Sequence, residues 1–157
     1  IGIHYFFMLT ENKKIKIIIN MSDKEIKIFF ISGHRDITEE EFRINYVQAI
    51  NDAIFNYHAK FIIGDYHGVD IMAQNYLIDV LKINPNDVTV CHMFDKPRNI
   101  NDKIVNIIGG FKNDEERDSY MTINSDEDIA FIRDRSKYKS GTAQNILRRK
   151  LFKQIKW

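Results

Sequence analysis

Residues 26–36 read IKIFFISGHRD, and this stretch indicates the class of fold. Its first half is rich in Ile and Phe, which favour strands. The continuous apolar end of that half is typical of a strand buried on both faces of a sheet. The following Ser32 and Gly33 are typical of a loop after a strand. A buried strand followed by such a loop and then by helical spacing predicts the first βα unit of a parallel sheet.

The same alternation of strand and helix signals continues along the chain. Thr38 and Glu41 have the spacing of a capping box at a helix start, and Pro85 ends the second helix. The expected strands lie at residues 26–31, 61–63, 88–93 and 129–132, and the expected helices at 38–57, 69–80, 100–108, 113–124 and 141–155. Gly109 and Gly110 are expected to close the third helix. The apolar stripe expected on the last helix is Ile146, Leu147, Leu151 and Ile155. We predict a three-layer α/β fold with a mainly parallel sheet of about five strands flanked by helices.

Length and cysteine content bound the class of protein. The chain has 157 residues, which suits one domain. We expect that domain at residues 25–157, and an N-terminal extension or an extra edge strand at residues 1–24. The single cysteine, Cys91, excludes an intrachain disulfide and a cysteine-based zinc cluster, so a cytoplasmic protein is expected. We find no apolar run of the roughly 20 residues that a membrane span needs, and we predict no membrane partner.

Charge is distributed unevenly along the chain. The 23 basic and 22 acidic residues give a formal charge of +1, yet residues 133–156 hold nine basic residues and one acidic residue. Part of this excess lies toward the end of a helix, where cations are favoured. The other basic residues of this stretch come directly before the segment SGT at 140–142. The basic stretch therefore favours an anionic partner, either a nucleotide or a nucleic acid.

A ligand site is expected in the loops that follow the strands. In an open parallel sheet, ligands bind outside the carboxyl ends of the strands. Glycines let the backbone approach a phosphate closely, and hydroxyls at a helix start add hydrogen-bond donors. The chain lacks both G-x-x-x-x-G-K-[ST] and G-x-G-x-x-G, which argues against a conventional kinase, GTPase or dehydrogenase. The residues predicted to line a site for a nucleotide or nucleoside phosphate are Ser32, Gly33, His34, Arg35, Gly64, Asp65, Gly68, Val69, Asp70, Ser140, Gly141 and Thr142.

Several of these residues also have a purely structural interpretation. Glycine is common at strand-to-helix turns, and a carboxylate such as Asp70 at a helix start stabilises the helix by ~0.3–1 kcal/mol. His34, His67 and His92 all fall near the carboxyl ends of expected strands, but their spacing is irregular. We therefore predict no metal site and no cofactor.

Four segments resemble one known superfamily. They are SGHR at 32–35, GDYHGVD at 64–70, ERDSYM at 116–121 and SGTAQN at 140–145. Their order and spacing resemble the SLOG superfamily of Rossmann-like nucleotide-binding domains, which includes the LOG cytokinin-activating phosphoribohydrolases and the DprA-type DNA-processing proteins. The resemblance covers roughly residues 25–149 and is to small single-domain members. It implies a Rossmann-like fold, a nucleotide or nucleoside-phosphate ligand and a homodimer.

The resemblance also implies roles for residues in the later segments. In the LOG enzymes an E-R-K-x-x-M segment supplies an active-site arginine, and a G-G-x-G-T-x-x-E segment supplies the catalytic glutamate. Arg117 matches that arginine and is expected to contact phosphate, with a solvated side chain or an ion pair with Asp114 or Asp118 as the structural alternative. Asp118 stands at the lysine position and Asn145 at the glutamate position. An amide is no general base near neutral pH. Catalysis would therefore need Glu116 or Asp118, and Asn145 is expected to hydrogen-bond the ligand.

Three functional hypotheses follow. The leading one is binding of a nucleotide or nucleoside phosphate at the carboxyl edge of the sheet. The second is an N-glycosidic hydrolase or transferase of nucleoside monophosphates, of the phosphoribohydrolase or deoxyribosyltransferase type, with Arg117, Glu116 and Asp118 as its catalytic residues. The third is nucleic-acid binding through the basic stretch at residues 133–156.

Overall fold

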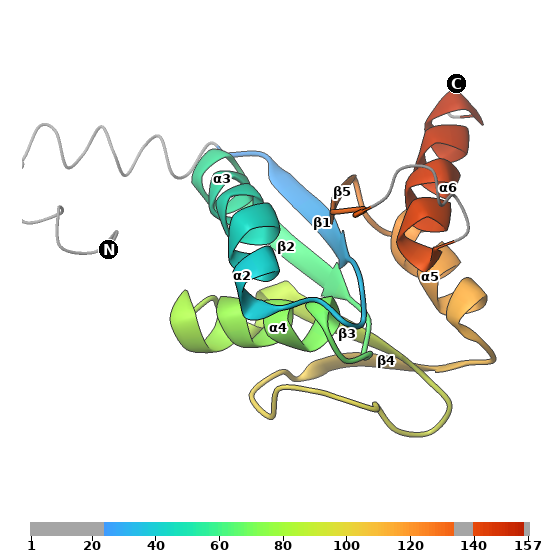
Figure 1. Ribbon diagram of the computed structural model, residues 1–157, viewed down its shortest axis with the longest axis horizontal. Coiled ribbons are helices and arrows are strands. Elements are labelled where there is room, and N and C mark those ends of the chain that lie inside the picture. Colours follow the sequence, from blue (N-terminus) through green and yellow to red (C-terminus); the bar gives the residue numbers. More distant parts are fainter. Residues whose placement is uncertain (1–23, 134–139, 156–157) are drawn as a thin grey trace, which may run out of the picture.

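A parallel sheet with helices on both faces forms the body of the protein (Figure 1). The computed structural model describes residues 24–133 and 140–155. Within them, five strands make one sheet in the order β4-β3-β2-β1-β5, and every neighbouring pair is parallel. The predicted α/β class is confirmed. The extension or edge strand expected at residues 1–24 lies outside the described residues, apart from Lys24.

The elements follow one another in βα order. They are β1 (Ile26–Ser32), α2 (Glu39–Phe42), a π-helical segment (Arg43–Val47), α3 (Gln48–Asn56), β2 (His58–Ile63), α4 (Val69–Asn75), a second π-helical segment (Tyr76–Val80), a 3-10 turn (Pro85–Asp87), β3 (Val88–Met93), β4 (Asn106–Phe111), α5 (Asp114–Ile123), β5 (Glu127–Ala130) and α6 (Gly141–Ile155). Thr38 and Glu41 form the predicted capping box. None of the helices in the described ranges is both long enough and apolar enough to cross a bilayer.

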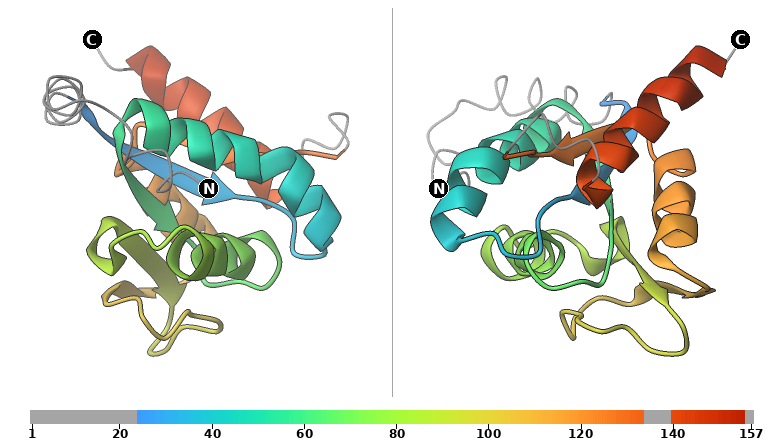
Figure 2. Two further views of the ribbon diagram at one scale, coloured as in Figure 1. Left: turned by 90° about the vertical axis from the view of Figure 1, so that its left-hand side faces the viewer. Right: turned by 45° about the vertical axis from the view of Figure 1, so that its right-hand side comes forward.

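Two helical layers cover the two faces of the sheet. Figure 2 shows α2, α3 and α4 on one face, and α5 and α6 on the other. The larger core lies under the first layer and includes Tyr46, Ile50 and Leu77, while Phe30 and Met121 belong to a smaller core on the α5 side. The chain runs outward from β1 to β4 and then returns to place β5 on the other side of β1. This reversal is where doubly wound sheets bind ligands.

The helix predicted at residues 100–108 is wrong, because residues 106–111 form strand β4. The β-branched side chains at 105, 107 and 108 favour a strand, and β4 pairs with β3. Gly109 gives room for the buried His92 ring, which a Cβ at that position would overlap, and Gly110 adopts a φ of +88°. The two glycines therefore belong to an irregular strand pair and do not end a helix.

Other boundaries differ from the prediction by a few residues. Strand β2 begins at His58 rather than at residue 61, and β5 spans Glu127–Ala130 rather than 129–132. The predicted apolar stripe of α6 is wrong at Leu147 and Leu151, which are 46% and 52% exposed. The helix instead buries Thr142, Ala143, Asn145 and Arg149. Polar side chains thus form much of the contact of α6 with its neighbours. The side chain of Ile155 is outside the described part.

Candidate functional site

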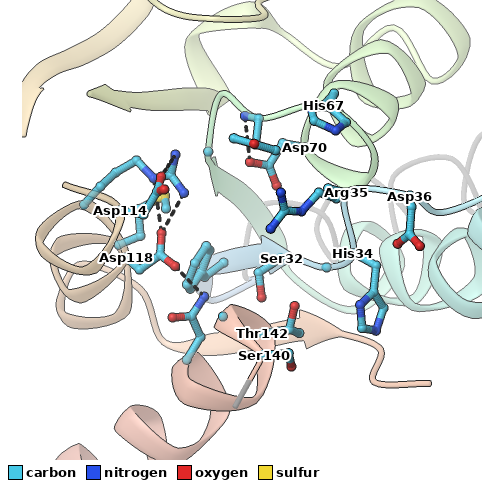
Figure 3. Close-up of a pocket in the computed structure, with 18 residues that line it drawn as sticks. Ser32, His34, Arg35, Asp36, His67, Asp70, Asp114, Asp118, Ser140 and Thr142 are labelled. Carbon is cyan, nitrogen blue, oxygen red and sulfur yellow. Dashed lines mark hydrogen bonds and ion pairs between the residues drawn. The ribbon is translucent and has the colours of Figure 1, made fainter. Parts of the chain in front are cut away.

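A pocket of about 400 Å³ opens at the carboxyl edge of the sheet (Figure 3). It is formed by the loops after β1 and β2, the start of α4, the inner face of α5 and the start of α6. Its volume lies within the range of small-molecule sites. Most of the predicted site residues line it, namely Ser32, Gly33, His34, Arg35, Gly64, Asp70, Arg117, Asp118, Ser140, Gly141, Thr142 and Asn145.

Four predicted site residues do not line the pocket. Asp65 is fully buried beneath it. Gly68 has a φ of +79° and lies against the carbonyl groups of residues 34 and 35, which a Cβ would overlap, so glycine is required there for packing. Val69 belongs to the core. Glu116 is exposed on α5, and its carboxylate accepts a hydrogen bond from the Lys112 N–H at 2.7 Å.

The end of β1 presents an unpaired polar group to the pocket. Ser32 is 6% exposed, and its Oγ is the buried side-chain oxygen that has no hydrogen-bond partner in the described part of the chain. The Tyr46 hydroxyl donates to the Ser32 carbonyl oxygen at 3.0 Å and accepts from the Phe131 N–H at 3.1 Å, which ties the ends of β1 and β5 together. Ser32 is therefore held rigidly while its hydroxyl stays free to bind.

The start of α6 faces the same space, since Ser140, Gly141 and Thr142 line the pocket together with Ser32 (Figure 3). The Ser140 hydroxyl accepts from the Ala143 N–H at 3.2 Å and so caps the helix. The N–H groups of Gly141 and Thr142 lie in the first turn and have no intrahelical acceptor, and the helix dipole adds partial positive charge. This end of the pocket is suited to an anion.

Arg117 is buried and fully engaged with carboxylates. Its guanidinium contacts Asp65 at 2.8 Å, Asp114 at 3.0 Å and Asp118 at 2.9 Å. Burial by itself lowers the pKa of Arg117, but the Asp118, Asp70 and Asp114 carboxylates together hold that pKa above its usual value. Asp65 also accepts two hydrogen bonds from the Arg98 guanidinium. A phosphate at Arg117 would meet this carboxylate cluster.

Asp118 is oriented by two neighbours. Its Oδ1 accepts from Nε and Nη2 of Arg117 at 3.1 and 2.9 Å, and its Oδ2 accepts from Nδ2 of Asn145 at 3.0 Å. The Asn145 Oδ1 in turn accepts from Arg148 at 2.7 Å. Both ends of the Asn145 amide are therefore occupied. Asn145 positions the Asp118 carboxylate in the pocket wall, and the ligand contact expected for it would use the second N–H or the second carbonyl lone pair of its amide.

Asp70 is the most perturbed acid in the pocket. Asp70 lies in the first turn of α4 and is 8% exposed, and its carboxyl group accepts a hydrogen bond from the Tyr66 N–H at 3.0 Å. Gly64 makes room for it, since a Cβ there would overlap the Asp70 carboxylate. Burial raises the pKa of Asp70 to about 7, with Arg117 opposing the rise and Asp118 and Asp65 adding to it. Asp70 therefore exchanges its proton near neutral pH.

The three histidines do not come together. His34 and His67 line the pocket, whereas His92 is buried beside Gly109. Among the described residues, no three His, Cys, Asp or Glu side chains are grouped to hold a metal ion. The Nε2 of His34 pairs with the Arg133 N–H at 3.2 Å. As an acceptor there, a neutral His34 carries its proton on Nδ1 and has that donor left for a ligand.

Sequence reasoning missed several residues of the pocket wall. Asp36 and Asp114 contribute carboxylates, and Phe30 and Met121 contribute apolar surface. Asp114 lies three residues before Arg117 on α5, and helical spacing indicated it as a partner of Arg117 but not as part of the pocket wall. Tyr66 also lines the pocket and lies under the Arg98 guanidinium, 4.3 Å from the ring centroid.

Much of the basic stretch that the structure describes has structural partners. Arg133 forms ion pairs with Asp36 at 2.9 Å and Glu41 at 2.7 Å. Arg149 is buried, pairs with Asp128 at 3.0 Å and donates to the Thr122 carbonyl at 2.7 Å. Residues 134–139 and 156 lie outside the described part. Nucleic-acid binding through residues 133–156 stays a prediction.

Comparisons with protein-family models, with curated proteins and with solved structures found no match to this chain. The resemblance to the SLOG superfamily, the homodimer and the cytoplasmic location therefore stay predictions. What the chain does has to be inferred from the chemistry of the pocket.

Proposed function

We propose that the chain binds a nucleotide or nucleoside phosphate at the carboxyl edge of its sheet, with the phosphate at the start of α6. The observation that carries this proposal is the buried Ser32 hydroxyl, which has no hydrogen-bond partner among the described residues and lines the same pocket as the first turn of α6. A donor hydroxyl, two N–H groups without intrahelical acceptors and the positive end of a helix dipole match a phosphoryl group.

The opposite end of the pocket is acidic and suits a different part of the ligand. Asp70, Asp114 and Asp118 lie there, and the charge of Arg117 is shared among its carboxylate partners. Carboxylates repel phosphate but accept hydrogen bonds from hydroxyl and amino groups. A ligand with an anionic end and a hydroxyl-rich sugar matches both ends. The phosphate contact expected for Arg117 is thus better assigned to Ser32, Gly141 and Thr142.

A matched pair of substitutions at Gly141 tests the phosphate position. Gly141 is exposed, and a Cβ there meets no atom within 4 Å. Asp in the first turn of a helix is favoured by the dipole, so Gly141→Asp should fold, but its carboxylate would repel a phosphate. We expect the affinity for AMP, measured by calorimetric titration, to fall at least ~10-fold in Gly141→Asp. Equal effects in Gly141→Asp and its neutral control Gly141→Asn would contradict this phosphate position.

A second candidate function is cleavage of the N-glycosidic bond of a nucleoside monophosphate. The observation that favours it is the presence of two carboxyl groups in one pocket, Asp118 held by Arg117 and Asn145, and Asp70 with its pKa raised to about 7. An ionised carboxylate and a carboxylic acid are the pair that glycosidic chemistry uses. Glu116, outside the pocket, is not suited to either role.

Release of free base from nucleoside monophosphates tests this second candidate. We expect chromatography to detect free base with the wild-type chain, and Asp118→Asn to reduce the rate by at least ~10²-fold. Glu116→Gln is the matched control, because this exposed carboxylate is on the same helix, and its rate should stay within ~2-fold of the wild type. Tight AMP binding without any release of adenine would leave binding alone as the function.

A further inference from the structure

The carboxyl group of Asp70 has one oxygen left for a ligand. Asp70 forms part of the pocket wall (Figure 3), and its Oδ2 accepts a hydrogen bond from the Tyr66 N–H at 3.0 Å. No other hydrogen bond to Asp70 is present among the described residues. Because the residue is 8% exposed, water replaces the missing partner only in part. The free Oδ1 is therefore available to a bound molecule.

The charges that face Asp70 do not neutralise it. Arg117 and Asp118 face it from α5, Asp65 from the end of β2, and the Tyr46 hydroxyl from the helix after β1. Arg35 and His67 line the same pocket from the loops. Arg117 already forms ion pairs with three other aspartates. Arg98 shares Asp65 and Asp114 with Arg117 and forms no ion pair with Asp70 among the described residues. Two guanidiniums that already face three carboxylates do not balance a fourth, so protonation is the means by which Asp70 avoids an uncompensated buried charge.

We propose that Asp70 binds the ligand as a neutral carboxylic acid, whose Oδ1–H donates a hydrogen bond to an acceptor atom of the ligand. The inference rests on the proposed function and names the Asp70 carboxyl group as one that recognises the sugar by a hydrogen bond. Asp118 in the same wall is ion-paired with Arg117 and acts as an acceptor. A donor and an acceptor in one wall match the hydroxyl groups of a sugar, which both accept and donate.

This arrangement couples ligand binding to proton uptake. Above the pKa of about 7 the free protein carries an ionised Asp70, which must take up a proton before it donates. Affinity therefore falls as pH rises, by up to tenfold for each pH unit, which amounts to ~30-fold between pH 6 and pH 8.5. Asn at this position donates through its amide at every pH. At pH 6 the affinity of Asp70→Asn for the ligand should equal that of the wild type. That affinity should not decrease as the pH rises.

Calorimetric titration with AMP from pH 6 to pH 8.5 tests the inference. The ligand's own phosphate also titrates near pH 6, but wild type and Asp70→Asn share that effect, so the difference between their profiles isolates Asp70. Titration of the wild type at pH 8 in two buffers with different ionisation enthalpies adds a measurement that needs no variant. We expect uptake of about one proton per AMP bound in the wild type and about none in Asp70→Asn.

The possible failures are distinguishable. Identical pH profiles in the two proteins, or no proton uptake in the wild type, would overturn the role of Asp70 while AMP binding itself remained. Absence of AMP binding at every pH, in protein shown by circular dichroism to be folded, would overturn the proposed function and this inference with it. Asp70→Ala, which has no donor, should bind at least ~10-fold more weakly than Asp70→Asn at every pH.

Discussion

Asp70→Asn should raise the free energy of unfolding by up to about 4 kcal/mol at pH 8 and by less than about 1 kcal/mol at pH 4. The folded-state pKa of Asp70 is raised from 3.8 to about 7 by burial. The folded state therefore binds this proton more tightly than the unfolded state. Ionisation of Asp70 costs stability progressively as pH rises from about 4 to about 7. Asn removes that cost, and urea denaturation at the two pH values measures it.

A stabilising substitution inside a pocket is the mark of a group kept for binding or catalysis and not for the fold. Asp102→Asn is the control, since Asp102 is exposed and its neutralisation should change stability by no more than about 0.5 kcal/mol. A loss of stability in Asp70→Asn at pH 8 would show that the ionised carboxylate supports the structure, for example through the start of α4. That result would remove the basis for a neutral Asp70.

Arg117→Met should lower the free energy of unfolding by about 3–5 kcal/mol at pH 7. The guanidinium side chain is 7% exposed, and its loss leaves the fully buried Asp65 with Arg98 alone and Asp118 with Asn145 alone. Burial raises the pKa of Asp65, but hydrogen bonds from Arg98 and the charges of Arg98 and Arg117 outweigh it and hold that pKa below its usual value. Uncompensated buried carboxylates are the cause of the expected loss.

The pH dependence of Arg117→Met separates this cause from a simple packing defect. Protonation of the stranded carboxylates relieves the cost, so the deficit should shrink between pH 7 and pH 4. Arg43→Met is the matched control, because Arg43 is exposed and its substitution should stay within about 0.5 kcal/mol of the wild type. A deficit of equal size at both pH values would contradict the assignment, as would a deficit no larger than that of the control.

The fold class was predictable because the local sequence indicates each of the strands β1, β2 and β3. The run at residues 26–31 and the boundaries of β3 follow from apolar residues flanked by polar loops. Strand β4 was not predicted because a glycine pair such as Gly109 and Gly110 is also typical of a helix C-terminus. Gly109 is instead required by the ring of His92 on the neighbouring strand, and Gly110 by its φ of +88°. A contact made across a sheet leaves no signal in the local sequence.

The location of the pocket was predictable, and so was the alternative pairing of Arg117 with its neighbours Asp114 and Asp118, but its contact with Asp65 was not. Residues at the ends of parallel strands must share one edge, which explains why Ser32, Gly64 and Thr142 meet. Whether an arginine is free or neutralised depends on residues far away in the chain. Arg117 meets Asp65, which lies 52 residues before it. Its spacing was compatible with a phosphate contact, whereas its ion pairs place it in the acidic half of the pocket.

The central claim is that an anion-binding helix start and the buried Ser32 hydroxyl together hold the phosphate of a nucleotide. Calorimetric titration of the wild-type chain with AMP and with adenosine at pH 6 tests it most directly, because the two ligands differ only in the phosphate. We expect AMP to bind at least ~10-fold more tightly than adenosine, because hydrogen bonds to a charged group contribute about 1.5–3 kcal/mol each. Equal affinity for the two ligands, or no binding of AMP, would contradict it.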